Sequence, residues 1–312
     1  MTRRRVISTM VAGALGMANR SSGKVNHPGK SGRFIRLGGP VFKDNCEPEE
    51  WVKAHQELGY TAAYCPIDAN ASTELIHSFE NAARKANLIL AEVGAWSNPI
   101  STDDEKRKQA IAFVQAQLDL ADRIGARCCV NIAGSRHPEQ WDGPHPDNLS
   151  GHTFDLIVES VRQIIDAVKP KRSFFTLEPM PWIYPDSVES YLKLIKVIDR
   201  KTFAVHLDPV NMVNSPSRFF RNGDFIREMF NKLGPTIKSC HAKDITLMDG
   251  FPVHLQECRP GLGHLDYSIY LRELAKLPDS PPLMLEHLEK PEEYRNAAEY
   301  IRSIAQKQAL SI

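Results

Sequence analysis

The sequence predicts a single (β/α)8 barrel that begins near residue 33. From that point, short apolar strands alternate with helix-periodic segments eight times. The strands are almost continuously apolar, as they are when helices cover a parallel sheet, and a count of eight favours a closed barrel. A doubly wound open sheet is the alternative, but no G-x-G-x-x-G turn follows any early strand. At 312 residues the chain has the length of many one-domain α/β barrels.

The first half of the barrel is expected to contain four strand and helix pairs. The predicted strands are residues 33–42, 61–67, 88–96 and 127–134. The predicted helices are 48–60, 72–87, 102–124 and 154–168. The third helix is expected to open with a capping box, Thr102 with Glu105, and to stop at Gly125.

The second half repeats this alternation after a long loop at 135–151. Its predicted strands are residues 173–180, 202–210, 237–244 and 282–288, each followed by a helix-periodic segment. The last of these helices is expected over 291–308. No domain boundary is expected after residue 33, so the barrel takes in 33–312.

Residues 1–32 are expected to be a leader and linker. Arg3, Arg4 and Arg5 precede a short apolar stretch at 6–18, an arrangement that resembles a twin-arginine export signal. This predicts an exported or periplasmic protein, and the alternative is a disordered basic leader on a cytoplasmic one. The apolar stretch is too short for a permanent anchor, so no stable membrane association is expected.

Charge and cysteine content narrow the functional classes. The formal net charge of +1 gives no electrostatic reason to expect a nucleic-acid partner. The six cysteines show no C-x-x-C spacing, so neither a zinc knuckle nor a redox dithiol is indicated. They are expected to be reduced and mostly buried. Cys128 and Cys129 are adjacent in a strand, so they should point to opposite faces.

Four consecutive strands end in side chains that can bind a metal. In such barrels the functional residues lie at the carboxyl ends of the strands. Several carboxylates gathered there would repel one another without a cation. Three oxygen ligands and one imidazole suit Mn²⁺ or Mg²⁺, with Co²⁺ or Zn²⁺ as substitutes. The predicted ligands are Glu178, Asp208, His241 and Glu286. Two residues before Asp208, His206 should point into the same interior, either to orient a ligand or as a core histidine.

The sequence resembles the xylose isomerase-like TIM barrels, which include sugar isomerases, sugar epimerases and endonuclease IV. The resemblance rests on the four predicted ligands and on the segment 259–274 (RPGLGHLDYSIYLREL). The resemblance covers about 33–305. It implies one Mn²⁺-like ion on the four ligands, with Glu178 and Glu286 acting as acid and base on opposite faces of a keto-sugar. It also implies that Arg259 contacts the substrate and that homo-oligomers can form.

Further substrate contacts are expected around this centre. The candidates are Trp96, Asn131, His206 and Asn211, with His137, Trp141 and His145 in the long loop. Each is also consistent with a packing role. Lys243 and Asp244 are expected to be either a substrate contact or a surface pair. Asn211 stands where related epimerases and endonucleases often have histidine, which weakens any mechanism that needs more than one metal.

The chemistry expected is removal of a proton next to a carbonyl through an enediolate, which gives isomerisation or epimerisation. One rival is a lyase that cleaves an oxidised C-glycoside after the same first step. An endonuclease IV-like repair hydrolase would need several metals and a basic groove. A non-catalytic sugar-binding subunit would be favoured by loss of an acid, but both glutamates are present.

Overall fold

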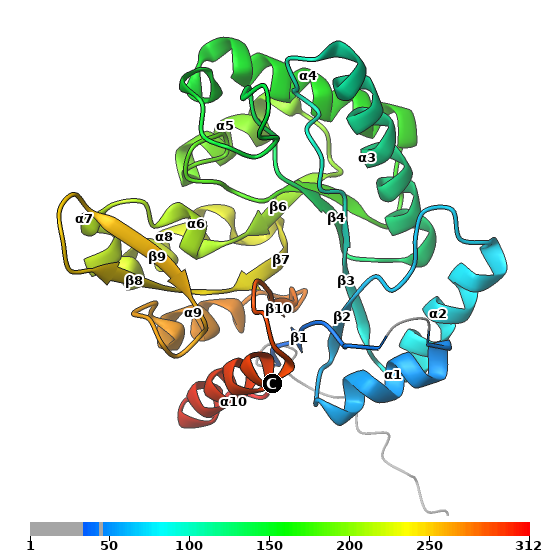
Figure 1. The fold of residues 1–312 in the computed structure, drawn as a ribbon. Coiled ribbons are helices and arrows are strands. Elements are labelled where there is room, and N and C mark those ends of the chain that lie inside the picture. The colour runs from blue at the N-terminus through cyan, green and yellow to red at the C-terminus, as the bar shows by residue number, and fades with distance from the viewer. Residues whose placement is uncertain (1–33, 44–45) are drawn as a thin grey trace, which may run out of the picture. The chain divides into compact units, whose positions relative to one another are not determined.

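The structure, a computed structural model, describes residues 34–43 and 46–312. These residues form a closed barrel of eight parallel strands surrounded by helices (Figure 1), which confirms the predicted (β/α)8 fold. The strands, in their order around the barrel, are β1 (Leu37–Gly38), β10 (Leu283–Leu285), β7 (Ile237–Ala242), β6 (Phe203–Leu207), β5 (Phe174–Leu177), β4 (Cys128–Asn131), β3 (Ile89–Gly94) and β2 (Ala62–Tyr64). β1 pairs in parallel with both β10 and β2, and this closes the barrel.

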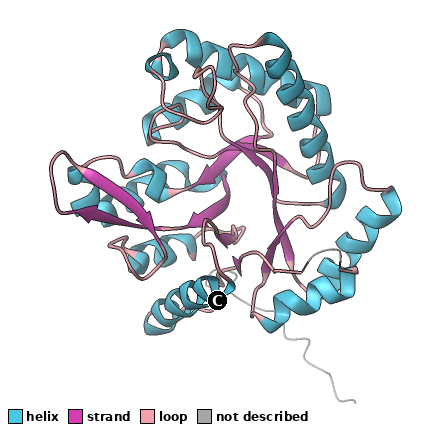
Figure 2. Cartoon of the chain, viewed as in Figure 1, coloured by secondary structure: helices cyan, strands magenta, loops and turns pink. Residues whose placement is uncertain are grey.

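The helices pack outside the ring of strands (Figure 2). They are α1 (Pro48–Glu57), α2 (Thr73–Lys85), α3 (Asp104–Ile124), α4 (Gly151–Val168), α5 (Val188–Ile198), α6 (Pro209–Met212), α7 (Pro216–Phe220), α8 (Asn222–Leu233), α9 (Tyr267–Leu274) and α10 (Pro291–Lys307). Every residue of β4 and β6 is buried, because one face of each strand fills the barrel and the other packs on helices. None of the helices in the described ranges combines the length and the apolar character needed to cross a membrane. The predicted leader, residues 1–32, lies outside the described residues.

The start of α3 differs from the predicted capping box. Asp103, not Thr102, caps the helix: its Oδ1 accepts hydrogen bonds from the amides of Glu105 (2.9 Å) and Lys106 (3.1 Å). A carboxylate one residue later can accept from two of the free amides of the first turn, which makes it the better cap. The helix ends at Gly125 as predicted, with a φ of 75°.

The predicted strand 237–244 corresponds to β7, and a hairpin that was not predicted follows it. β7 ends at Ala242, and a new strand, β8 (Asp244–Met248), pairs antiparallel with β9 (His254–Cys258) in a hairpin that extends outward from the barrel (Figure 1). A single strand and helix were expected here. The hairpin was missed because β9 is exposed or half-buried throughout and β8 is buried only at its first two residues, so neither strand has the long buried run that marks a barrel strand.

Asp244 is a buried anchor for the glycine-rich segment, which corrects the surface-pair interpretation. Its carboxylate accepts hydrogen bonds from the amides of Gly261 (2.9 Å), Gly263 (3.2 Å), Leu265 (2.8 Å) and Ile245 (2.9 Å). A Cβ on Gly263 would overlap the Asp244 carboxylate, so only glycine fits at that position. The loop after the hairpin is therefore folded around one carboxylate.

Candidate metal centre and substrate cavity

The four predicted ligands converge at one end of the barrel. Glu178, Asp208 and Glu286 each follow directly on the last residue of a strand, and His241 lies near the end of β7. Because the strands are parallel, their carboxyl ends share one rim. One ligand atom from each of the four side chains lies within 4.8 Å of the others. His241 Nδ1 is 2.7 Å from Glu286 Oε1, 3.4 Å from Glu178 Oε1 and 3.8 Å from Asp208 Oδ2.

The donor set fits a divalent cation. Asp208 Oδ2 and Glu286 Oε1 are buried, and neither makes a well-aligned hydrogen bond within the described residues, although the Lys243 ammonium lies 2.8 and 2.6 Å from them. Three carboxylates and an imidazole form a hard to borderline ligand set, typical of sites for Mn²⁺ or Mg²⁺ and open to Co²⁺ or Zn²⁺. These four side chains therefore form a cluster that could hold a metal ion.

Lys243, which was expected to be either a substrate contact or half of a surface pair, lies in the middle of this cluster. The side chain is 1% exposed, and its Nζ lies 2.6 Å from Glu286 Oε1, 2.8 Å from Asp208 Oδ2 and 3.3 Å from Glu178 Oε1. Lys243 is thus no surface residue. Its position two residues after His241 was the available signal, because alternate residues of an extended chain point the same way.

The charges of this cluster shift the acidities of its members. Burial alone would raise the pKa of Asp208, but the Lys243 ammonium and the His241 imidazole outweigh it and hold the pKa well below its ordinary range. Burial would likewise raise the pKa of Glu286, and the same two cations lower it. For Lys243 the signs reverse: burial lowers its pKa, and the surrounding carboxylates, led by Asp208, raise it well above the ordinary value.

A cavity of about 680 Å³ opens above the cluster. Glu178, Glu286 and Lys243 form its floor, and Glu257 of β9 and His287 add polar groups to its wall. Aromatic side chains line much of the rest, and faces of this kind suit the apolar side of a sugar ring. They are Tyr64, Trp96, Trp141, Trp182 and Tyr294. The hairpin thus contributes to the site through Glu257, whose Oε1 lies 3.2 Å from His287 Nδ1.

The expected substrate contacts divide into two groups. Trp96 and Asn211 line the cavity, and the Asn211 amide donates a 2.9 Å hydrogen bond to Glu178 Oε1. Arg259, Asn131 and His206 do not line it. The Arg259 guanidinium donates to the carbonyl of Pro260 (3.2 Å), and Asn131 accepts from the amide of Ser97 (3.1 Å).

The long loop after β4 also has mixed roles. Trp141 lines the cavity, whereas the His137 and His145 rings accept hydrogen bonds from nearby backbone amides and so support turns of the loop. Trp182, which the sequence analysis did not name, donates a 2.8 Å hydrogen bond to the carbonyl of Asp142. This bond ties two of the loops at the cavity mouth together.

Glu92 is a further buried acid that the sequence analysis missed. It lies in β3, is 1% exposed and forms a group with His206 and His241. Burial raises its pKa, but the His206 and His241 imidazoles, with a hydrogen bond from Ser239, lower it below the ordinary value overall. The signal was an acidic residue in the middle of an apolar strand.

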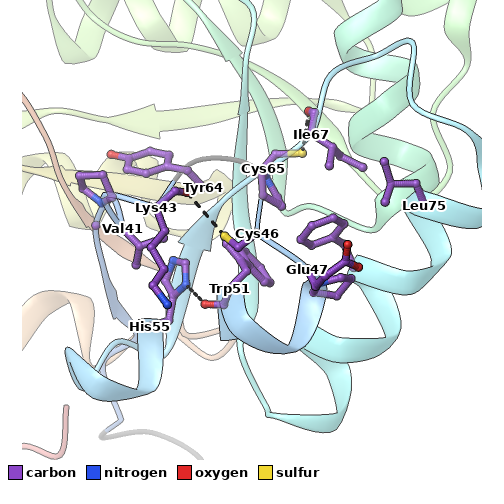
Figure 3. Close-up of a pocket in the computed structure, with 15 residues that line it drawn as sticks. Val41, Lys43, Cys46, Glu47, Trp51, His55, Tyr64, Cys65, Ile67 and Leu75 are labelled. Atoms are coloured by element: carbon purple, nitrogen blue, oxygen red, sulfur yellow. Dashed lines mark hydrogen bonds between the residues drawn. The ribbon is translucent and has the colours of Figure 1, made fainter. Parts of the chain in front are cut away.

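Figure 3 shows a second hollow, of about 400 Å³. It shares the lining residues Pro40 and Tyr64 with the first cavity. Its other walls come mainly from the region around α1, with Trp51 and His55 among the residues shown. Both groups of metal-ligating side chains found in the described residues lie elsewhere, at the barrel rim and interior. We therefore assign the chemistry to the first cavity.

Comparisons with known proteins agree with the barrel fold. A family model described as "Xylose isomerase-like TIM barrel" matches residues 52–304. The solved structure of 3-keto-D-glucoside 4-epimerase YcjR from E. coli, in its apo form, superposes with a TM-score of 0.63 at 16% identity, covering 86% of this chain and 99% of that chain. A xylose isomerase-like TIM barrel protein from Mycobacterium smegmatis, in complex with magnesium, gives 0.62 at 19% identity, covering 88% and 96%.

The solved structure of endonuclease IV from Thermus thermophilus also superposes on this chain. Its TM-score is 0.67 at 13% identity, and the match covers 88% of this chain and 99% of that chain. At such identities these structures share the fold of this chain. No curated protein sequence matches it.

Proposed function

This chain belongs to the xylose isomerase-like TIM barrel family, and on that basis we propose that it is a divalent-metal-dependent sugar isomerase or epimerase. The observation that carries the proposal is the convergence of Glu178, Asp208, His241 and Glu286 within 4.8 Å beneath an aromatic-lined cavity. The family's enzymes include sugar epimerases, among them the 3-keto-D-glucoside 4-epimerase. We propose Mn²⁺ as the metal, with Mg²⁺, Co²⁺ or Zn²⁺ as substitutes.

The acids at the cavity floor perform the proton transfers in this proposal. A bound divalent cation supplies Lewis-acid polarisation of the substrate carbonyl. Glu178 and Glu286 come from strands separated by β6 and β7, so they approach the cavity from different sides. One glutamate removes the proton beside the carbonyl, and the enediolate then takes a proton from the other. Delivery to the same carbon from the opposite face gives the epimer. Delivery to the former carbonyl carbon gives the isomer, when the proton of the neighbouring hydroxyl also passes to the former carbonyl oxygen.

Lys243 and the aromatic residues complete the proposed site. The Lys243 ammonium lies at the cavity floor, where it can donate to a substrate oxygen as negative charge develops. Trp96 and Trp141 offer indole faces to the sugar ring, and each has more than a third of its surface exposed in the cavity region. The Asn211 amide donates a hydrogen bond to Glu178, and its side chain offers no imidazole to a second metal ion.

Deuterium incorporation tests the proposal. The protein is stripped with chelator, reloaded with Mn²⁺ and incubated in deuterated water with ketohexoses and 3-keto-glucosides. We expect deuterium at the carbon beside the carbonyl, and its final position tells epimerisation from isomerisation. Glu286→Gln should reduce the exchange rate by at least about 10²-fold, because it removes a proton-transfer group.

The matched control is Glu289→Gln, an exposed glutamate three residues further on, which should exchange like the wild type. Exchange that survives Glu286→Gln would remove that residue from the proposed role. Nicking of abasic DNA, or release of the aglycone from an oxidised C-glycoside, with no exchange into a keto-sugar, would instead assign the protein to the endonuclease or lyase branch.

A further inference from the structure

Glu92 occupies an unusual position inside the barrel. β3 and β7 lie opposite each other in the ring of strands, and Glu92 reaches across the interior from β3 with only 1% of its surface exposed. Barrel interiors are usually filled by layers of bulky apolar side chains. A carboxylate buried there is costly unless specific partners compensate it.

The partners of Glu92 come from β7 and β6. Its Oε2 lies 3.3 Å from His241 Nε2, and its Oε1 accepts a hydrogen bond from the Ser239 hydroxyl. His206 Nδ1 is 3.6 Å from the same Oε1, beyond direct hydrogen-bond distance. The carboxylate is therefore fixed by a hydroxyl on one oxygen and directed at the metal-centre histidine with the other.

His241 is consequently placed between two sets of acids. Nε2 faces Glu92, while Nδ1 faces the ligand cluster, 2.7 Å from Glu286 Oε1. An imidazole binds a metal through an unprotonated nitrogen, and the hydrogen bond made by the other nitrogen decides which one that is. A carboxylate at Nε2 keeps the proton there and leaves the Nδ1 lone pair for the metal.

We propose that Glu92 is a positioning residue for the metal centre, which holds His241 in the Nε2-protonated form with Nδ1 directed at the ion. It touches neither the ion nor the substrate. The inference depends on the metal centre described above, but not on the sugar chemistry proposed for it.

Other contacts restrain the same ring. The His206 ring packs against it with centroids 4.0 Å apart and an interplanar angle of 71°. The Tyr270 hydroxyl donates a 2.8 Å hydrogen bond to the backbone carbonyl of His241. His206 thus restrains a ligand through ring packing, while Glu92 alone among these neighbours bonds to the imidazole nitrogen. The proton position is therefore assigned to Glu92.

The test measures binding of Mn²⁺ alone, by titration calorimetry, to the full protein and its variants. Glu92→Gln keeps the size of the side chain but loses the charge that retains the Nε2 proton. We expect its Mn²⁺ affinity to fall by about 10- to 100-fold, the usual effect of removing a carboxylate partner of a metal-bound histidine. Glu289→Gln, the same substitution at an exposed glutamate outside the site, is the matched control and should bind Mn²⁺ like the wild type.

A second measurement, NMR of the imidazole nitrogens, shows which nitrogen of His241 carries the proton. In ¹⁵N-labelled wild-type protein loaded with diamagnetic Mg²⁺, we expect the His241 proton on Nε2, and this result stands even if Glu92→Gln fails to fold. A proton on Nδ1, or unchanged Mn²⁺ affinity in a folded Glu92→Gln variant, overturns the inference and leaves the proposed sugar chemistry intact. Weakened Mn²⁺ binding in a protein that exchanges no deuterium into any sugar supports the inference and overturns the proposed function. A wild-type protein that binds no divalent cation overturns both.

Discussion

Lys243 places a buried positive charge among the acids of the site. Its ammonium is buried among Asp208, Glu178, Glu286 and Glu257, at distances from 2.6 to 3.6 Å. Like charges gathered at such distances repel strongly in a medium from which water is excluded. One built-in cation therefore offsets part of the repulsion that a divalent ion would otherwise have to balance alone.

Lys243→Met should destabilise the protein in the presence of chelator by about 3–5 kcal/mol, the usual cost of leaving buried charges without their partner. Added Mn²⁺ should reduce this difference, because its charge replaces that of the ammonium. Urea unfolding, with and without Mn²⁺, measures both effects.

Lys276→Met provides the comparison for Lys243. Lys276 also pairs with a carboxylate at 2.6 Å, but its side chain is 61% exposed, so the loss should be about 1 kcal/mol or less. Equal losses in the free energy of unfolding from the two substitutions would show that Lys243 stabilises the protein no more than an exposed ion pair does.

Among the elements, the β8–β9 hairpin and the loop that follows it set this barrel apart from the simple alternation of strand and helix. The hairpin brings Glu257 to the cavity wall, and the loop wraps around the Asp244 carboxylate through amides of Gly261, Gly263 and Leu265. Gly261 adopts a φ of 95°, and a Cβ there would lie 2.8 Å from the Tyr300 ring. The glycines are thus needed by the backbone path of the loop.

Asp244→Ala should destabilise the protein by several kcal/mol, since each buried amide left without an acceptor costs about 1–3 kcal/mol. Thermal unfolding followed by circular dichroism measures this loss. Asp249→Ala, an exposed aspartate in the hairpin turn, should have little effect. A stable Asp244→Ala variant would mean that the loop keeps its path without the carboxylate.

In the whole molecule, the proposed metal binding would be coupled to folding. The four ligands are spread from residue 178 to residue 286 and come from four neighbouring strands of the closed ring. They meet only when that part of the barrel is assembled, so an unfolded chain offers no comparable site. Any ion bound there stabilises the folded barrel by mass action.

Mn²⁺ should therefore raise the melting temperature of the chelator-treated protein in a concentration-dependent way. The stabilisation expected at a free concentration of 100 times Kd is about 2.7 kcal/mol. Scanning calorimetry at increasing Mn²⁺ measures the shift. The melting temperature of Asp208→Asn, which lacks one charged ligand, should rise much less with Mn²⁺. A rise equal to that of the wild type would mean that the ion binds elsewhere.

The barrel and the four candidate ligands could be predicted from the sequence alone. Parallel strands covered on both faces are apolar throughout, and their carboxyl ends meet at one rim, so Glu178, Asp208 and Glu286 were visible as acids at the ends of apolar runs. Such signals are local: each depends on the period of the strand and on the residue that follows it.

Only the tertiary structure decided how distant residues meet. Glu92 and His241 are separated by 149 positions, and nothing local connects an acid in β3 with the far nitrogen of a histidine in β7. The sequence left Lys243 open between a substrate contact and a surface pair, and only the fold shows it as a buried cation, because the acids around it come from other strands and from the hairpin. Periodicity predicts which way a side chain points within its own element, whereas its partners depend on closure of the barrel. That is why the convergence of the four candidate ligands could be predicted and their surroundings could not.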